Sequence, residues 1–223
     1  PDIKNSDFLF KKLIYPYNHE QKIFTRNAPT RPIAFLSFGI NYYFGNLNPF
    51  GYHLINLFLH IMIAILIFFL TKALMTYSNL RESTFFPFLV ALIFAIHPMQ
   101  TGTVTYIYKR TDLLVTLFFI GTLLFFISSQ NQRSSLKKIT MYCLSIFSFL
   151  FALGSKENAV ILPMIVIIFD YIYLCHCQLR ILQTRLRYHV FYWTILFMYL
   201  AWKYFYLGGI GDTEALNTIS AFE

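Results

Sequence analysis

Charged side chains are scarce in this chain of 223 residues: they make up 13% of it, whereas hydrophobic residues make up 57%. An ordinary soluble domain carries roughly 25% charged residues, and a soluble chain with so few would expose large apolar patches. The few charges also cluster in short segments between long apolar runs. The composition therefore excludes an ordinary soluble globular protein and predicts a protein that lies in a lipid bilayer.

Cysteine is rare as well, with only three residues of this type. Cys143 lies within an apolar run, where we expect it to be a small core residue. Cys175 and Cys177 flank His176 at a spacing shorter than that of a zinc-binding Cys pair, and no second pair follows. The sequence therefore indicates no disulfide framework and predicts no metal site at these residues, and it leaves the cofactors unknown.

Acidic residues are fewer than basic ones, 10 against 18, which gives a net charge of +8. No basic run is interleaved with aromatic residues in a polar segment, so nucleic acid is not an expected partner. In membrane proteins positive loops mark the orientation and contact anionic lipid headgroups. The lipid bilayer is therefore the first expected partner.

The chain also has no recognisable internal repeat. This absence counts against a secondary transporter, because those folds often contain two related halves. The sequence begins at Pro1 with neither an initiator Met nor a signal-peptide pattern. We therefore expect it to be an interior segment of a longer protein.

Long apolar runs predict the architecture. A helix needs about 20 residues to cross a bilayer, and continuously apolar runs without dyad alternation exclude the strands of a barrel. Residues 33–44 form a shorter run, which predicts an interfacial or re-entrant helix. Six runs are expected to span the membrane: 52–75, 85–96, 113–128, 139–153, 158–174 and 188–206. The predicted fold class is all-α, a polytopic helical bundle, with residues 1–32 as a juxtamembrane loop and residues 33–223 as the membrane domain.

Basic residues in the short connections predict the orientation. The richer set contains Lys72, Arg81, Arg133, Lys137, Lys138, Arg180, Arg185 and Arg187. The poorer set contains Lys109, Arg110, Lys156 and Lys203. The positive-inside rule places the richer set in the cytoplasm, so the poorer set and residues 1–32 are expected on the extracytoplasmic side.

Four polar features fall at this extracytoplasmic end, and we expect them to line one cavity. They are Arg31-Pro32, the 97–112 connection, residues 155–157 and residues 208–212. Arg110 is suited either to anchoring at the interface or to binding a lipid phosphate. Asp112 is expected in the first turn of a helix, where the dipole favours an acid.

The third of these features predicts a helix start. Ser155 is a plausible N-cap, and Glu157 suits the first turn. Lys156 is disfavoured at a positive helix end, so a bound anion nearby would explain it better. Asp170, about 20 Å further along a helix, is expected to be structural.

A polar stripe inside the first span consists of His53, Asn56 and His60. Their spacing places them on one helical face, which we expect to turn into the bundle. They are interpreted either as interhelical hydrogen-bonding groups or as a metal or proton site.

Three blocks of residues occur in a distinctive order and spacing. They are Arg31-Pro32, Asn41-Tyr42 and residues 48–54 with Asn56 and His60; residues 94–98 with Arg110 and residues 112–114; and residues 155–160 with Leu162-Pro163 and Asp170. Together they resemble the membrane domain of the transmembrane and tetratricopeptide-repeat (TMTC-type) O-mannosyltransferases. That family belongs to the GT-C superfamily, so the resemblance implies a GT-C-like bundle.

The resemblance also implies a reaction. Such an enzyme moves a sugar, mannose or a similar one, from a polyprenyl-phosphate carrier to an acceptor hydroxyl, often a Ser or Thr of a protein. The reaction takes place on the extracytoplasmic face of a bacterial inner membrane or of the endoplasmic reticulum. A carboxylate of the family's first lumenal loop acts as the base. Compared with the family, this sequence is expected to be a fragment that lacks the first helix and the C-terminal repeats, so the catalytic residues are expected upstream of Pro1.

Motif matching gives the candidate residues for binding the donor and its carrier: Arg31, His97, Arg110, Asp112, Lys156 and Glu157. Arg110 and Lys156 are expected to contact the carrier phosphate, and Asp112 and Glu157 to orient them or the sugar. Two alternatives to the enzyme remain open at this point. One is a non-catalytic membrane anchor or scaffold for a tetratricopeptide-repeat domain, and the other is a transporter.

Overall fold

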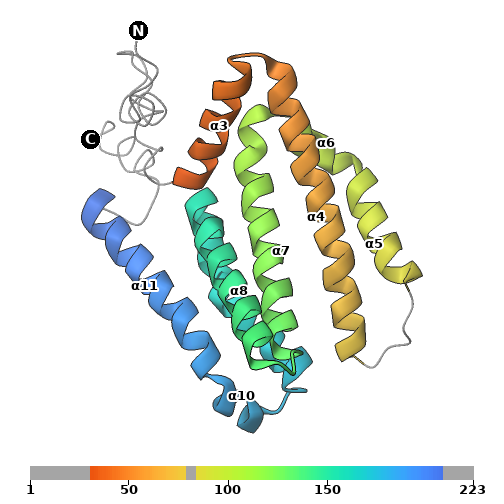
Figure 1. The fold of residues 1–223 in the computed structure, drawn as a ribbon, viewed down its shortest axis with the longest axis vertical. Helices are drawn as coiled ribbons and strands as arrows, with labels where there is room; N and C mark the ends of the chain where they lie inside the picture. Colours follow the sequence, from red (N-terminus) through yellow and green to blue (C-terminus); the bar gives the residue numbers. More distant parts are fainter. Residues whose placement is uncertain (1–30, 79–83, 208–223) are drawn as a thin grey trace, which may run out of the picture.

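The computed structural model describes residues 31–78 and 84–207, and every regular element in these ranges is helical. The α-helices are α3 (Pro32–Gly45), α4 (Pro49–Tyr77), α5 (Phe85–Ile96), α6 (Thr101–Thr105), α7 (Arg110–Gln130), α8 (Ser135–Ser155), α9 (Leu162–Phe169), α10 (Leu179–Arg185) and α11 (Arg187–Leu207). Short 3₁₀ turns cover Pro98–Gln100, Ile107–Lys109 and Glu157–Ile161, and a π-helical turn covers Asp170–Leu174. Figure 1 shows α11, α8, α7, α4 and α5 in this order across the bundle, with α3 at the upper end and α10 at the lower end.

The predicted membrane bundle is confirmed. Within the described ranges, four helical stretches are long and apolar enough to cross a bilayer: Pro49–Tyr77, Ile107–Gln130, Ser135–Ser155 and Glu157–Leu174. A fifth span results if Phe85–Ile96 and Pro98–Thr105 are taken as one span bent by 51°. The run at 188–206, expected as a sixth span, forms the 21-residue α11, which does not reach the same hydropathy. Its Tyr and Trp residues and its charged Lys203 account for the difference, because they lower the mean hydropathy.

The break between α3 and α4 follows from the local sequence. α3 ends at Gly45, and Asn46 then adopts a left-handed conformation with φ of 50°. The Asn48 side chain accepts a hydrogen bond from the Phe50 amide, and Pro49 occupies the first position of α4, where its missing N–H is not needed. The expected short helix before this break is therefore present, and the chain turns sharply into the first span.

Small residues let α7 and α8 approach closely. A Cβ added to Gly121 would lie 2.9 Å from Ser148 Oγ. Ser148 donates to the Phe118 carbonyl at 2.8 Å, and Ser145 donates to the Thr122 carbonyl at 2.6 Å. Interhelical hydrogen bonds of this kind and close backbone contact hold helices together in lipid, where burial of apolar side chains gives no advantage.

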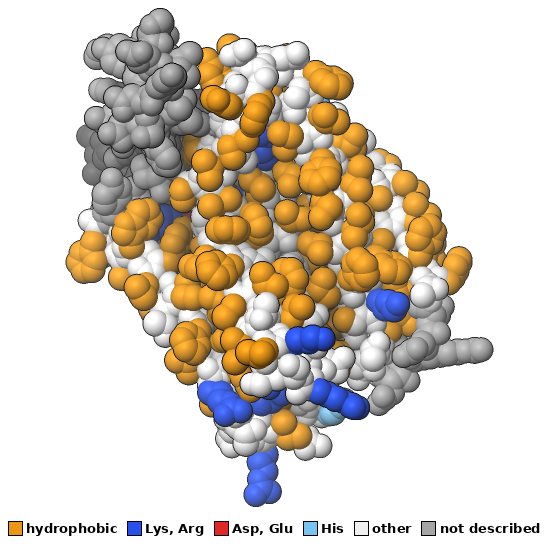
Figure 2. Space-filling view, in the orientation of Figure 1, with side chains coloured by type: hydrophobic (Ala, Val, Ile, Leu, Met, Phe, Trp, Pro, Cys, Tyr) orange, Lys and Arg blue, Asp and Glu red, His pale blue; other side chains and the backbone are white. Residues whose placement is uncertain are grey.

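Apolar side chains cover the outside of the bundle. Figure 2 shows hydrophobic residues over most of the visible face, with Lys and Arg gathered near the lower end. Phe197 on α11, for example, is 63% exposed. Cys143 is also exposed, so the expectation of a core position for it was wrong: it lies on the outer face of α8. An exterior of this kind suits contact with lipid rather than with water.

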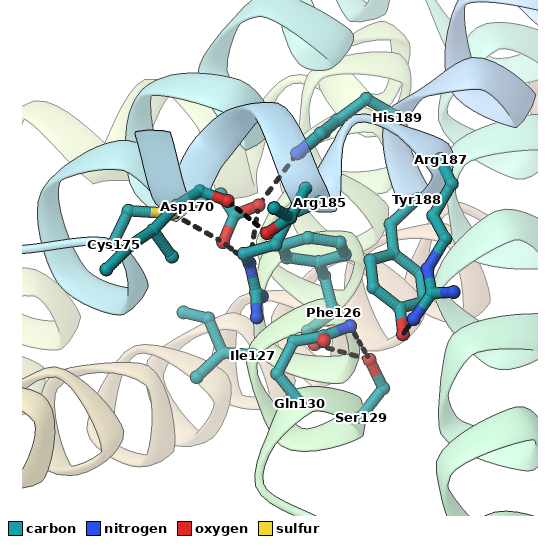
Figure 3. A network of polar contacts seen from close by, with 12 residues as sticks. Phe126, Ile127, Ser129, Gln130, Asp170, Cys175, Arg185, Arg187, Tyr188 and His189 are labelled. Atoms are coloured by element: carbon teal, nitrogen blue, oxygen red, sulfur yellow. Dashed lines mark hydrogen bonds and ion pairs between the residues drawn. The ribbon is translucent and has the colours of Figure 1, made fainter. Parts of the chain in front are cut away.

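Asp170 connects three helical segments at the lower end of the bundle (Figure 3). Its fully buried carboxylate accepts from Arg185 Nε at 2.8 Å and lies 2.8 Å from His189 Nε2. The Cys175 thiol lies 3.9 Å from the same carboxylate. These contacts join the end of α9 to α10 and the start of α11, which is the structural role expected for this residue.

Candidate functional site

Side chains from five segments meet toward the upper end of the bundle and form a charged cluster. Asp112 in the first turn of α7 pairs with Lys156, which follows α8, and lies 3.5 Å from Lys109 Nζ. Glu157 pairs with Lys203 of α11 at 2.9 Å. Arg31, just before α3, donates to the Tyr108 hydroxyl at 3.1 Å. We call this set the upper cluster; its members are Arg31, Lys109, Asp112, Lys156, Glu157 and Lys203.

Packing of the Pro32 and Ile33 side chains against Gly154 brings the first and third sequence blocks together here. A Cβ on Gly154 would lie 2.7 Å from an Ile33 side-chain carbon and 3.6 Å from Pro32. The end of α8 is therefore pressed against the start of α3, which sets Arg31 close to Lys156. Of the predicted site residues, the structure thus brings Arg31, Asp112, Lys156 and Glu157 into one region.

The electrostatics of the upper cluster favour an anion. It holds four basic and two acidic side chains, so its net charge is +2. Lys156, Asp112 and Glu157 are each about one quarter exposed, which leaves them accessible to a ligand. Arg31 Nε is buried and has no hydrogen-bond partner among the described residues.

Arg110 has a different position from the one expected. Its guanidinium is fully buried and donates to the side chains of Asn56 and Asn41, each at 2.9 Å. It also donates to the backbone carbonyls of Ser37 and Tyr52, at 3.2 and 3.0 Å. The guanidinium carbon lies 4.7 Å from the Phe38 ring centre. Because protein acceptors occupy the guanidinium, it holds α3, α4 and α7 together and is not open to a phosphate.

The helix start predicted at Ser155 is also different. Ser155 is the last residue of α8, and its hydroxyl donates back to the Phe151 carbonyl at 2.7 Å. It is therefore not an N-cap. Lys156 adopts an extended conformation after α8, and Glu157 opens the following 3₁₀ turn, so an acid does stand in a first turn as expected.

The histidine candidates do not join the upper cluster. His97 ends α5, and its Nδ1 accepts locally from the Met99 amide at 3.2 Å. Of the stripe on α4, Asn56 and His60 turn inward, and His60 contacts the Ala95 carbonyl at 3.1 Å. His53 is exposed, so its expected inward orientation was wrong. The interhelical hydrogen-bonding interpretation therefore holds for Asn56 and His60.

Three residues of this region were not among the predicted site residues. Lys203 was counted only as a loop charge, yet it lies within α11 and reaches Glu157 from there. Tyr108 and Asn41 serve as partners of Arg31 and Arg110. A single Lys within an aromatic run was a usable signal for Lys203, whereas nothing in the spacing indicated Tyr108.

Residues 208–212, expected at the same end, lie outside the described residues. Among residues 31–78 and 84–207, no group of three or more His, Cys, Asp or Glu side chains is arranged to hold a metal ion.

Comparison with known proteins identifies relatives of the chain. No family model and no solved structure match it. It is 32% identical to protein O-mannosyl-transferase TMTC4 of Homo sapiens, over 66% of this chain and 21% of that protein. It is 26% identical to protein O-mannosyl-transferase Tmtc3 of Drosophila melanogaster, over 70% of this chain and 19% of that protein. It is also 37% identical to protein O-mannosyl-transferase TMTC2 of Mus musculus, over 46% of this chain and 12% of that protein.

The chain thus spans about a fifth or less of the length of these relatives. These matches support the resemblance of the chain to a TMTC-type membrane domain.

Proposed function

We propose that this chain is part of a membrane glycosyltransferase. The enzyme would move mannose or a similar sugar from a polyprenyl-phosphate carrier to a Ser or Thr hydroxyl of an acceptor protein, on the extracytoplasmic face. Three relatives carry the name protein O-mannosyl-transferase, which supports the class of reaction. The observation that carries the proposal is the upper cluster, a partly exposed, net positive site at one end of a membrane bundle.

In this proposal Lys156 and Arg31 bind the carrier phosphate. The Lys156–Asp112 pair is partly exposed, and such pairs contribute only about 0–1 kcal/mol, so a phosphate can compete with Asp112 for the ammonium group. Asp112 holds Lys156 in position before the donor arrives. Arg31 adds the unpartnered Nε donor, which suits a phosphate oxygen.

The chemical step requires charge stabilisation at the carrier. The bond between the sugar C1 and the phosphate oxygen breaks, the acceptor hydroxyl oxygen bonds to C1, and the hydroxyl proton passes to a general base. The departing phosphate gains negative charge, which the basic side chains of the upper cluster stabilise. We propose that the base is a carboxylate outside the described residues.

Replacing Lys156 with Ala in the full-length protein tests this assignment. A hydrogen bond to a charged group contributes about 1.5–3 kcal/mol, so the apparent KM for a polyprenyl-phosphate sugar is expected to rise about 10- to 150-fold. Lys137→Ala, which removes an exposed Lys from the opposite end of α8, is the matched control and should leave this KM unchanged.

Equal donor kinetics for Lys156→Ala and the unmodified enzyme would contradict the assignment. Absence of any sugar transfer by the intact protein would instead favour the scaffold for a repeat domain. Lys156→Arg, which keeps the charge, should retain most of the donor affinity.

The orientation in the membrane can be tested with the native cysteines. Cys177 is exposed beside α10, and Cys175 is buried. Burial first, and then the neighbouring Asp170 carboxylate, raise the pKa of the Cys175 thiol and so lower its thiolate fraction. In variants that keep one cysteine each, a membrane-impermeant maleimide applied from the cytoplasmic side should label Cys177, and should label Cys175 at least about tenfold more slowly. Labelling of Cys177 only from the opposite side would reverse the proposed orientation.

A further inference from the structure

A second polar site lies at the lower end of the bundle, far along α8 from the upper cluster. It is a pocket of about 520 Å³ between the starts of α8 and α11. Its lining includes Lys138, Ile139 and Tyr142 of α8 and Arg187, Tyr188 and Phe191 of α11. We call it the lower pocket.

Two cations are held in place around one aromatic ring in this pocket. Lys138 Nζ lies 4.9 Å and the Arg187 guanidinium carbon 5.0 Å from the centre of the Tyr188 ring. Arg187 also donates to the Tyr188 hydroxyl at 3.1 Å, and Figure 3 shows the two side chains against each other. The Tyr142 hydroxyl donates to the Tyr188 carbonyl at 2.7 Å, which fixes the backbone beneath the ring. The cations are therefore positioned before any ligand binds.

These cations have no carboxylate partner within residues 31–78 and 84–207. The Asp170 carboxylate at this end pairs with Arg185 and His189. Neither Lys138 nor Arg187 takes part in an ion pair with a described residue. Figure 2 shows basic side chains near this end and no coloured acidic side chain among them on the visible face. Because α8 and α11 both begin here, their dipoles add to the positive potential.

Ser135 also lines the pocket, and the apolar part of the lining, Ile139 and Phe191, continues onto the lipid-facing surface. Ile139 is 57% and Phe191 60% exposed, and each lies in a long helix of the bundle. A soluble phosphate would use only the cations and would gain nothing from these side chains. An amphiphile with an anionic head and a hydrocarbon chain matches both parts of the lining.

We infer that the lower pocket binds an anionic phospholipid. Lys138 and Arg187 contact the headgroup phosphate, and an acyl chain lies along Ile139 and Phe191. Basic pockets between membrane helices bind lipid headgroups in this way, and each Lys or Arg near an anionic lipid surface contributes about 1 kcal/mol. The site is separate from the proposed transferase site and does not depend on it.

Lipid titration of the full-length protein in detergent, followed by native mass spectrometry, tests the inference. The probes are dioleoyl phosphatidylglycerol, dioleoyl phosphatidylcholine and soluble glycerol phosphate. The double variant Lys138→Gln, Arg187→Gln is expected to bind phosphatidylglycerol about 30-fold more weakly than the unmodified protein. Lys138→Arg should retain binding. Arg180→Gln, which removes an exposed charge of α10 outside the pocket, is the matched control and should retain it too.

Each outcome decides the inference. Selective loss of phosphatidylglycerol in the double variant, with weak binding of phosphatidylcholine throughout, supports it. An equal loss with Arg180→Gln would show diffuse surface attraction and overturn it. Glycerol phosphate bound as tightly as the lipid would show a site for a soluble phosphate and overturn the assignment to a lipid. The melting temperature of the double variant shows whether it folds. If it does not, Phe191→Ala, which weakens only the contact with the acyl chain, serves as the second test. An unchanged affinity of Phe191→Ala for phosphatidylglycerol would contradict binding of a lipid.

Discussion

Replacing Arg110 with Lys is expected to lower the free energy of unfolding by at least about 3 kcal/mol, although the charge is kept. The guanidinium donates to four acceptors on α3 and α4. The positions of these acceptors match the rigid, planar arrangement of its N–H groups. A Lys ammonium is a point donor on a flexible stem and cannot reach these positions at once. The Asn41 and Asn56 carbonyl oxygens would then be left buried without their present donor, which adds to the loss.

The unfolding of the purified full-length protein in detergent, followed by fluorescence during heating, measures this effect. Lys109→Ala is the matched control, because its side chain is 52% exposed and immediately precedes Arg110. A substitution at such a surface position changes stability by only about 0.5 kcal/mol. If the Arg110→Lys protein is as stable as the control, the planar guanidinium is not needed for stability. The prediction that Arg110 contacts the carrier phosphate would then be favoured again.

The helices of this fold could be predicted closely, since each depends on a local property. The apolar runs are long enough to require helix in a membrane, and His97-Pro98 ends α5 where the sequence indicated. Gly45 and Pro49 likewise mark the break between α3 and α4. Errors arose where a local signal competed with packing. Ser155 resembles an N-cap in isolation, but Gly154 is pressed against Ile33, and α8 continues through Ser155.

The candidate site could be predicted only in part. The charged residues that gather near the upper end could be recognised, because charges are rare within the apolar runs and these residues lie where the runs end. Their partners could not be, because pairs such as Lys156 with Asp112 are 44 residues apart and depend on how α7 and α8 pack. Helical spacing also placed His53 and Asn56 on one face, but only Asn56 is buried, where its amide donates to the Val104 and Tyr106 carbonyls; His53 stays exposed. Periodicity gives the direction of a side chain, and the neighbouring helices decide whether anything lies in that direction.

Asp170→Asn is expected to lower the free energy of unfolding by about 3–5 kcal/mol, the range for removing one partner of a buried ion pair. The change keeps the size of the side chain and removes its charge. The carboxylate is fully buried and pairs with both Arg185 and His189. Arg185 Nη2 already lacks a hydrogen-bond partner among the described residues. Without the carboxylate, the Arg185 charge stays partly buried and uncompensated. The α9–α10–α11 junction should therefore open before the rest of the bundle.

Two measurements separate this local opening from a general loss of stability. Thermal unfolding gives the size of the effect, with Arg180→Gln at the same end as the matched control, since its exposed side chain should change little. Maleimide labelling of Cys175 gives the location, because this buried thiol lies against Asp170 and should react faster once the junction opens. Combining Asp170→Leu with Arg185→Met should recover much of the stability, because a buried ion pair can often be replaced by apolar side chains of similar volume without loss. If Asp170→Asn instead unfolds like the control and leaves Cys175 unreactive, the ion pairs do not hold the junction, and the packing of Tyr192 against Phe126 and Phe149 must do so.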